Sequence, residues 1–193
     1  MLKNALYFIR HGETDWNVER RIQGTSDIPL NQKGRQLALR HGKVMAQMDE
    51  DWTRYRFVVS PLSRTRETFE IIQGELGNDI EPRFEPRIAE NSFGRWEGCT
   101  WADLIETERD AHDRFIANPW DDVPHGGESY GDVAERLSSW IAEIEQPTVA
   151  VAHGGVSRVL RRLYLGTPVH QLMDLSVSQN RFMRFQNGEV EYL

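Results

Sequence analysis

Two short apolar runs of this 193-residue chain each end in a histidine that is followed by glycine. Residues 5–9 run into Arg10 and His11, and residues 148–152 run into His153. Such runs alternate along the chain with longer amphipathic segments, a pattern typical of a mainly parallel sheet with helices on both faces. Because ligands of such sheets bind beyond the carboxyl ends of the strands, we expect the two imidazoles to share one functional edge.

A third apolar run, residues 56–60, is followed by Arg64, which adds a second guanidinium group to the same predicted edge. Arginine presents a planar fork of donors that matches phosphate oxygens. Neighbouring arginines disfavour a protonated imidazole, and a neutral imidazole is a nucleophile that can attack phosphorus. The glycines after His11 and His153 let backbone N–H groups approach an anion closely. These residues therefore indicate phosphoryl transfer, which also needs a carboxyl group to protonate the leaving alkoxide.

Hydrophobic periodicity predicts the elements that position these side chains. We expect strands over residues 5–9, 56–60, 80–84, 148–152, 176–185 and 189–193. We expect helices over residues 31–48, 60–76, 101–118, 130–145 and 156–165. Ser60 and Pro61 are typical of a helix start, and Asn187-Gly188 is typical of a hairpin turn. The prediction is a single domain over residues 1–193, an α/β protein built as a three-layer α/β/α sandwich with a mainly parallel central sheet.

The overall composition is that of a soluble globular protein, with 39% hydrophobic and 27% charged residues. A net charge of −7 argues against binding to nucleic acid or to an anionic membrane surface. The single cysteine, Cys99, excludes an intramolecular disulfide and favours a cytoplasmic location. The N-terminal segment has neither the cleavage site of a signal peptide nor the length of a membrane span.

Several sequence motifs occur in the order in which the histidine phosphatase superfamily, also called the phosphoglycerate mutase-like proteins, carries them. They are RHGETDWN at 10–17, QGTSDIPL at 23–30, SPLSRTRET at 60–68, ENSFGRWEG at 90–98, PHGGES at 124–129 and HGG at 153–155. On these motifs the chain resembles the superfamily from residue 6 to about residue 165. The resemblance implies a phosphohistidine chemistry that uses neither a metal ion nor another cofactor.

The resemblance also implies a role for individual side chains. His11 is expected to be phosphorylated during turnover, and His153 is the second catalytic histidine. Glu90 is expected to protonate the leaving group and then to act as the base for the incoming water. The phosphoryl oxygens are expected to be held by a set of donors: Arg10, Arg64, His153, Asn17 and the backbone near Gly154.

Gln23, Gly24 and His125 also lie within the motifs and are candidates for contact with the rest of the substrate. Tryptophans close to the motifs in sequence are expected to wall the pocket: Trp16, Trp96, Trp101 and Trp120. Other conspicuous side chains are predicted to have no part in the site. The arginines are expected at the surface: Arg66, Arg161 and Arg162. The remaining histidines are expected to be structural or exposed: His41, His112 and His170. Trp52 and Trp140 are expected to pack in the core.

Three functions fit these motifs: a phosphomonoester hydrolase, a phosphoglycerate mutase-type phosphoryl transferase, and a non-catalytic module that binds a phosphorylated ligand. Mutases of the superfamily carry a longer segment, with basic residues, after the third motif. Here residues 99–123 hold seven acidic residues against two arginines, and we expect them to cap the pocket and to repel a phosphoglycerate. A binding module is expected to have lost part of the motif set, whereas all of it is present. The sequence therefore favours a phosphatase for a small phosphorylated substrate, and it carries no signal of oligomeric state.

Overall fold

A six-stranded mixed sheet forms the centre of the computed structural model, which describes residues 4–77 and 79–193. The strand order is β3-β2-β4-β1-β5-β6. Four strands are mutually parallel: β1 (Leu6–Arg10), β2 (Arg56–Val59), β3 (Arg83–Phe84) and β4 (Thr148–Ala152). The antiparallel strands β5 (Met183–Gln186) and β6 (Glu189–Tyr192) extend the sheet beyond β1. Positive φ angles at both Asn187 and Gly188 allow the tight turn that joins β5 to β6, as the sequence predicts.

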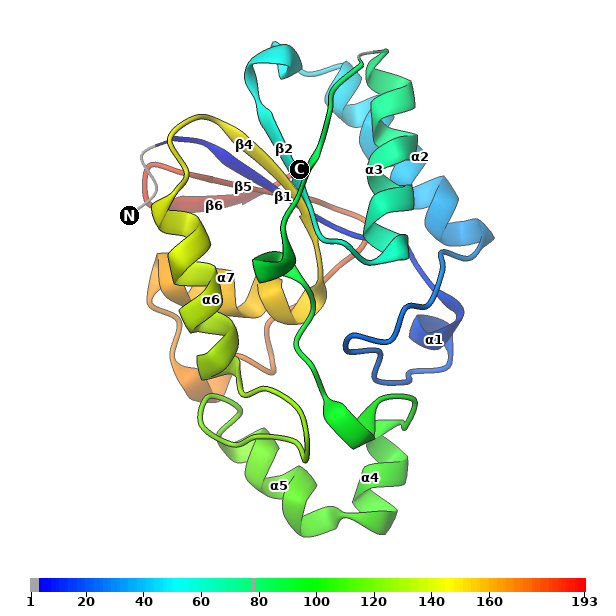
Figure 1. Cartoon of the computed structure of the whole chain (residues 1–193), viewed down its shortest axis with the longest axis vertical. Helices are drawn as coiled ribbons and strands as arrows, with labels where there is room; N and C mark the ends of the chain where they lie inside the picture. Colours follow the sequence, from blue (N-terminus) through cyan, green and yellow to red (C-terminus); the bar gives the residue numbers. More distant parts are fainter. Residues whose placement is uncertain (1–3, 78) are drawn as a thin grey trace.

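Helices cover both faces of this sheet, which confirms the predicted three-layer architecture (Figure 1). One face is covered by α2 (Gln32–Ala46) and α3 (Ser63–Leu76), and the other by α6 (Tyr130–Ala142) and α7 (Gly154–Leu165). Alternate residues of β1 enter the two cores: Leu6 and Phe8 join the α6/α7 core, whereas Tyr7 and Ile9 join the α2/α3 core. Burial on both faces explains why the strand sequences read as continuous apolar runs.

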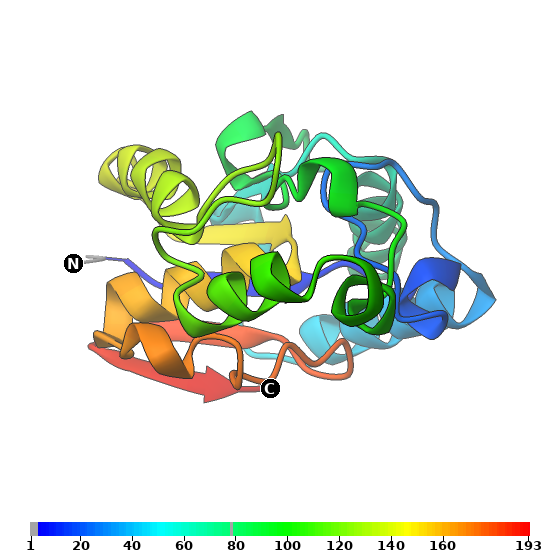
Figure 2. The same ribbon diagram turned by 90° about the horizontal axis from the view of Figure 1, so that it is seen from below.

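Two further helices lie beyond the carboxyl ends of β1 and β4, apart from the sheet (Figures 1 and 2). They are α4 (Trp101–Thr107) and α5 (Arg109–Ala117), in place of the single helix predicted over residues 101–118. The chain breaks at Glu108, whose backbone is non-helical, and its carboxylate accepts from the indole N–H of Trp96 at 3.2 Å and from Arg95 at 2.6 Å. A tertiary contact therefore interrupts a segment that is helical by its local pattern.

The N-terminus of α3 also differs from the prediction. The helix begins at Ser63, not at Ser60-Pro61, and its N-cap Leu62 has no side-chain cap. Asp27, far away in sequence, accepts hydrogen bonds from the Ser63 backbone N–H at 2.8 Å and from its hydroxyl at 2.7 Å. The Ser60 hydroxyl instead lies 2.7 Å from Nε2 of His153. The predicted cap was wrong because the serine hydroxyl is engaged by the second histidine.

Other differences are confined to short segments. Residues 176–182 form no strand and cross toward the carboxyl ends of the sheet, so the predicted strand 176–185 begins only at Met183. The predicted strand over residues 80–84 shortens to β3, and a short helix, α1 (Asp15–Val18), was not predicted. Arg161, predicted at the surface, is 3% exposed and donates to the hydroxyl of Tyr192 and to the Ser157 and Ser176 carbonyls. Trp52 and Trp140 are buried as predicted.

None of the helices in the described parts of the chain is long and apolar enough to cross a membrane. The described residues also form short 3₁₀ turns: Trp52–Arg54, Pro86–Ile88, Gly94–Trp96 and Val169–Gln171. The second of these turns comes directly before the segment that carries Glu90, which has no regular secondary structure of its own.

Candidate active site

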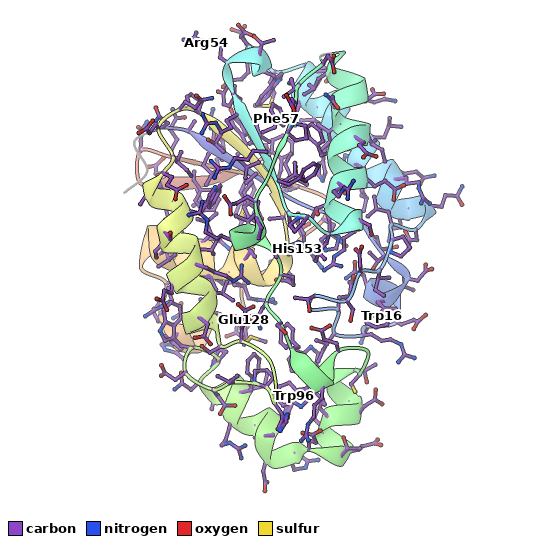
Figure 3. The ribbon with its side chains drawn as sticks, in the orientation of Figure 1. Trp16, Arg54, Phe57, Trp96, Glu128 and His153 are labelled. Atoms are coloured by element: carbon purple, nitrogen blue, oxygen red, sulfur yellow. The ribbon has the colours of Figure 1, made fainter. Side chains whose placement is uncertain are left out.

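The pairing of β1 with β4 brings the two predicted histidines together. Arg10 lies opposite Ala152 in the parallel register, and the backbone N–H of His11 donates to the Ala152 carbonyl at 3.0 Å. The imidazole rings of His11 and His153 follow directly, with centroids 5.2 Å apart. Both rings are buried, with exposed fractions of 2% and 0%. Figure 3 shows His153 at the end of β4, in the middle of the molecule.

His11 is held as a neutral imidazole with one defined orientation. Its Nδ1 lies 2.7 Å from the Gly12 carbonyl, which can only accept, so Nδ1 carries the proton and Nε2 keeps its lone pair. Burial, and then the positive charges of Arg64 and Arg10, hold the pKa of His11 well below 6.5. The nucleophilic form expected from the arginine-rich surroundings is therefore the stable one.

Gly12 has a different role from the one predicted for it. Its backbone N–H donates to the Thr68 hydroxyl at 3.1 Å and is not available to an anion. A Cβ at this position would lie 2.3 Å from the carbonyl oxygen of Gly34 in α2. The glycine is needed because the loop after β1 passes against the backbone of α2.

His153 is held beside His11 through one of its ring nitrogens. Its Nε2 bonds the Ser60 hydroxyl, and its buried Nδ1 has no hydrogen-bond partner in the described parts of the chain. Burial, followed by the charges of Arg64, His11 and Arg10, lowers the pKa of His153 well below 6.5. With Ser60 donating to Nε2, the neutral ring carries its proton on Nδ1, which is then an unused donor among the described residues.

Two guanidinium groups lie beside the histidines. Arg10 donates to the Val177 carbonyl, and burial lowers its pKa to about 10, so it remains a cation at neutral pH. Arg64 is fully buried and donates to the carbonyls of Ser26 at 2.7 Å and Gly24 at 2.8 Å. The Nε atoms of both arginines are buried without a partner among the described residues. Two fixed cations are therefore available for an anion in front of His11.

Asn17 is oriented by a residue that the sequence analysis missed. Its side-chain oxygen accepts from the Thr14 backbone N–H and from the side-chain amide of Gln179, each at 3.1 Å. The Asn17 NH₂ group is thereby left as the pocket-facing donor. Gln179 also donates to the His11 carbonyl at 3.0 Å. No local pattern signals this contact, because Gln179 comes from the irregular segment near the C-terminus.

Glu90 reaches the site from an irregular segment between two helical turns. Its carboxylate accepts from the Gly155 backbone N–H, at 3.0 Å to Oε1 and 3.2 Å to Oε2, at the N-terminus of α7. A Cβ on residue 155 would lie 2.6 Å from Oε1, so the contact requires glycine there. The structure thus places a carboxyl group in the same pocket as the nucleophile.

Most of these side chains line one pocket, with an open volume of about 160 Å³. Of the sequence-predicted residues, the lining includes Arg10, His11, Asn17, Gln23, Gly24, Arg64, Glu90 and Gly154. His153, whose ring lies beside that of His11, is not among the lining residues. His125 is exposed and does not line the pocket, and only its backbone carbonyl is engaged, by the N–H of Arg95 at 3.2 Å. Within residues 4–77 and 79–193, no group of three or more His, Cys, Asp or Glu side chains could hold a metal ion.

A family model described as the histidine phosphatase superfamily (branch 1) matches residues 6–188 of the chain. The chain belongs to the histidine phosphatase superfamily. It is 34% identical over 190 residues to the "Probable phosphoglycerate mutase GpmB" of Escherichia fergusonii, across 96% of this chain and 82% of that protein.

Solved structures of the superfamily have the same fold. The Bacillus stearothermophilus protein YhfR has a TM-score of 0.82 and 32% identity, over 98% of this chain and 95% of its own. A mycobacterial glucosyl-3-phosphoglycerate phosphatase has a TM-score of 0.79 and 29% identity, over 93% of this chain and 88% of its own. Both a phosphatase and a named mutase are therefore similar to this superfamily member.

Of the four tryptophans expected to wall the pocket, Trp101 lines it, whereas Trp16, Trp96 and Trp120 do not. The pocket also contains residues outside the motifs: Arg21, Ile22, Tyr130, Arg158 and Val177. Arg158 could have been found, because it lies four residues after Gly154 and therefore on the same face of α7. From the acidic segment 99–123, only Trp101 lines the pocket. The charge of that segment is carried by side chains outside the lining, so its predicted repulsion of phosphoglycerate stays a prediction.

Proposed function

We propose that this superfamily member hydrolyses small phosphomonoesters through a covalent phosphohistidine on His11. The observation that carries the proposal is the neutral, buried His11 ring, whose Nε2 lone pair is kept available by the Nδ1 contact to Gly12. A neutral imidazole placed beside the guanidinium groups of the buried Arg64 and the half-buried Arg10 suits attack on a phosphate ester, whose charge the arginines offset.

In the proposed first step, Nε2 of His11 forms a bond to phosphorus and the bond from phosphorus to the ester oxygen breaks. Glu90 gives its proton to the departing oxygen, which leaves as an alcohol. In the second step a water molecule attacks the phosphohistidine while Glu90 takes its proton. The P–N bond breaks, and inorganic phosphate and neutral His11 are regenerated.

The phosphoryl oxygens would be held throughout by fixed donors: Arg10, Arg64, His153 Nδ1, the Asn17 amide and the backbone near Gly154. These donors are oriented by the protein before the substrate binds, as the contacts of Arg64 and Asn17 indicate. Preorganised donors of this kind stabilise the charge that spreads over the equatorial oxygens in the transition state.

A mutase is the second candidate, because the relative from Escherichia fergusonii carries that name. It would use the same phosphohistidine and pass the phosphoryl group to a hydroxyl of a phosphoglycerate in place of water. Incubation with 3-phosphoglycerate separates the two functions. A phosphatase releases inorganic phosphate, whereas a mutase forms 2-phosphoglycerate with little release.

Replacement of the nucleophile tests the covalent step. His11→Ala should abolish turnover of any phosphomonoester and remove the phosphate label trapped on the protein by rapid quench. The label on the unchanged protein should be labile in acid and stable in base. Hydrolysis by His11→Ala at the unchanged rate would overturn the phosphohistidine.

Replacement of the acid tests the role of Glu90. General acid catalysis contributes about 10²–10⁴-fold, so Glu90→Gln should lose about that factor in the phosphorylation step of an alkyl ester. An activated aryl ester expels a phenolate that needs no proton, and its loss should be far smaller. Single-turnover rates measure this step alone. Equal losses on both esters would contradict the assignment of Glu90 as the acid.

A further inference from the structure

The backbone around Glu90 is held by one side chain from α6. Arg136 donates through Nη1 to the carbonyls of Arg87 at 2.6 Å and Ala89 at 2.9 Å, and through Nη2 to the carbonyl of Glu90 at 3.2 Å. Three carbonyls within four residues thus share one guanidinium group. The segment has no strand or helix at Glu90, so these hydrogen bonds from Arg136 hold the backbone at that residue in place.

Arg136 is itself held by a carboxylate. Glu128 accepts from Nε of Arg136 at 3.0 Å and from Nη2 at 3.2 Å, a two-bonded pair with side-chain exposures of 19% for Arg136 and 30% for Glu128. Such planar pairing orients the guanidinium group as well as binding it. Figure 3 places Glu128 at the start of α6.

The same carboxylate fixes the chain on the far side of Glu90. Glu128 accepts from the Ser92 backbone N–H at 3.0 Å, and its own N–H donates to the Ser92 carbonyl at 2.8 Å. Glu90 therefore lies between two clamped points, the Arg136-bound carbonyls before it and the Glu128-bound residue after it. Its carboxylate is held separately, by the backbone N–H groups of Gly155 and Asn91.

Neither Arg136 nor Glu128 lines the pocket. Both therefore act only through the residues that they hold. The position of Glu90 matters because a proton donor must lie within hydrogen-bond reach of the leaving oxygen, and a displacement of about 1 Å can cost about 10²-fold in rate.

We propose that Arg136, oriented by Glu128, is a positioning residue that holds Glu90 where its carboxyl group can protonate the leaving group. The proposal rests on the proposed role of Glu90 as the general acid. It predicts that damage to the clamp impairs proton delivery and leaves nucleophilic attack by His11 intact.

The test replaces Arg136 with lysine, whose single ammonium group cannot bind three carbonyls and the Glu128 carboxylate together. In single turnover, Arg136→Lys should slow phosphorylation by an alkyl phosphate by about 10- to 100-fold. With p-nitrophenyl phosphate the loss should be under about threefold, because the leaving group needs no proton. The loss should appear in the maximal rate and not in the substrate concentration for half-saturation.

A matched control is Arg162→Lys. Arg162 in α7 also donates to a backbone carbonyl, that of Thr167 at 2.6 Å, and packs over Trp120 at 4.4 Å, but it forms no hydrogen bond or ion pair with residues 87–92. Its replacement should leave the alkyl-to-aryl rate ratio unchanged. Should Arg136→Lys not fold, Glu128→Gln supplies the test, since it weakens the orientation of Arg136 and should shift the ratio in the same direction.

A double substitution separates positioning from general stabilisation. When Glu90→Gln already removes proton delivery, adding Arg136→Lys should cost less than about threefold more on the alkyl ester. Equal slowing of both esters by Arg136→Lys, or multiplied losses in the double variant, would overturn the proposal. Equal slowing of both esters by Glu90→Gln alone would instead show that the acid assignment is wrong, and the proposal would fall with it.

Discussion

The carboxyl ends of the sheet and the segment 99–123, which we term the cap, contribute to the pocket in opposite ways. The sheet ends supply buried, hydrogen-bonded groups: His11, Arg64 and His153 are each at most 2% exposed. The cap stands apart from the sheet (Figure 1), its charged side chains lie outside the pocket lining, and Trp101 is its one contribution to that lining.

Under the proposed function, this difference would separate two tasks. Every phosphomonoester shares the phosphoryl group, and the donors proposed to bind it belong to rigid elements that place them before a substrate arrives. The rest of the substrate varies, and the lining available for it includes aromatic and arginine side chains such as Phe93, Trp101 and Arg158. We therefore expect changes at the sheet ends to affect all esters alike, and changes in the cap to alter the preference between esters.

The largest loss of activity is expected from substitution of Arg64 at the sheet ends. Arg64→Lys keeps the charge and loses the planar fork, and loss of one such donor costs about 10²–10³-fold. The value of kcat/KM should fall by that factor for alkyl and aryl esters equally. Arg66→Lys, on the exposed face of the same helix, is the matched control and should change little. A loss that differs tenfold between esters would contradict the separation of tasks.

A smaller, ester-dependent effect is expected at Trp101. Its ring lies 6.1 Å from Phe93 and 6.0 Å from Phe115, so Trp101→Leu should retain part of the packing. An aromatic contact contributes about 0.5–1.5 kcal/mol, and the ratio of kcat/KM for a bulky aryl ester to that for a small alkyl ester should fall by up to about tenfold. A uniform loss over a panel of esters would show that Trp101 does not select among them.

The smallest effect is expected from the acidic side chains of the cap. Glu106 and Asp110 are exposed and do not line the pocket, and salt at physiological strength screens exposed charges beyond about 8 Å. The double variant Glu106→Gln, Asp110→Asn should change kcat/KM for 3-phosphoglycerate by less than about threefold. A tenfold rise would instead support the repulsion expected from the sequence and would give the cap an electrostatic role.

The same contrast shows where sequence-based prediction succeeds. The strands were predicted where apolar runs are buried on both faces, and the residues that follow them, His11 and His153, were placed correctly at one edge. The cap and the segment 176–182 were predicted less well. Their conformation depends on contacts such as Glu108 with Trp96 and Arg10 with Val177, which join residues that no local pattern relates.

By itself the sequence determined the residue types of the site, the position of the two histidines at the ends of strands, and membership of a superfamily with a recognisable set of motifs. Only the tertiary structure decided which nitrogen of His11 is protonated, which serine Nε2 of His153 binds, and that Asp27 caps α3. It also decided that Gln179 orients Asn17 and that Arg136 and Glu128 clamp Glu90. The physical reason is that these are hydrogen bonds between side chains and distant backbone groups. Their partners are chosen by packing in three dimensions, whereas hydrophobic periodicity reports only local burial.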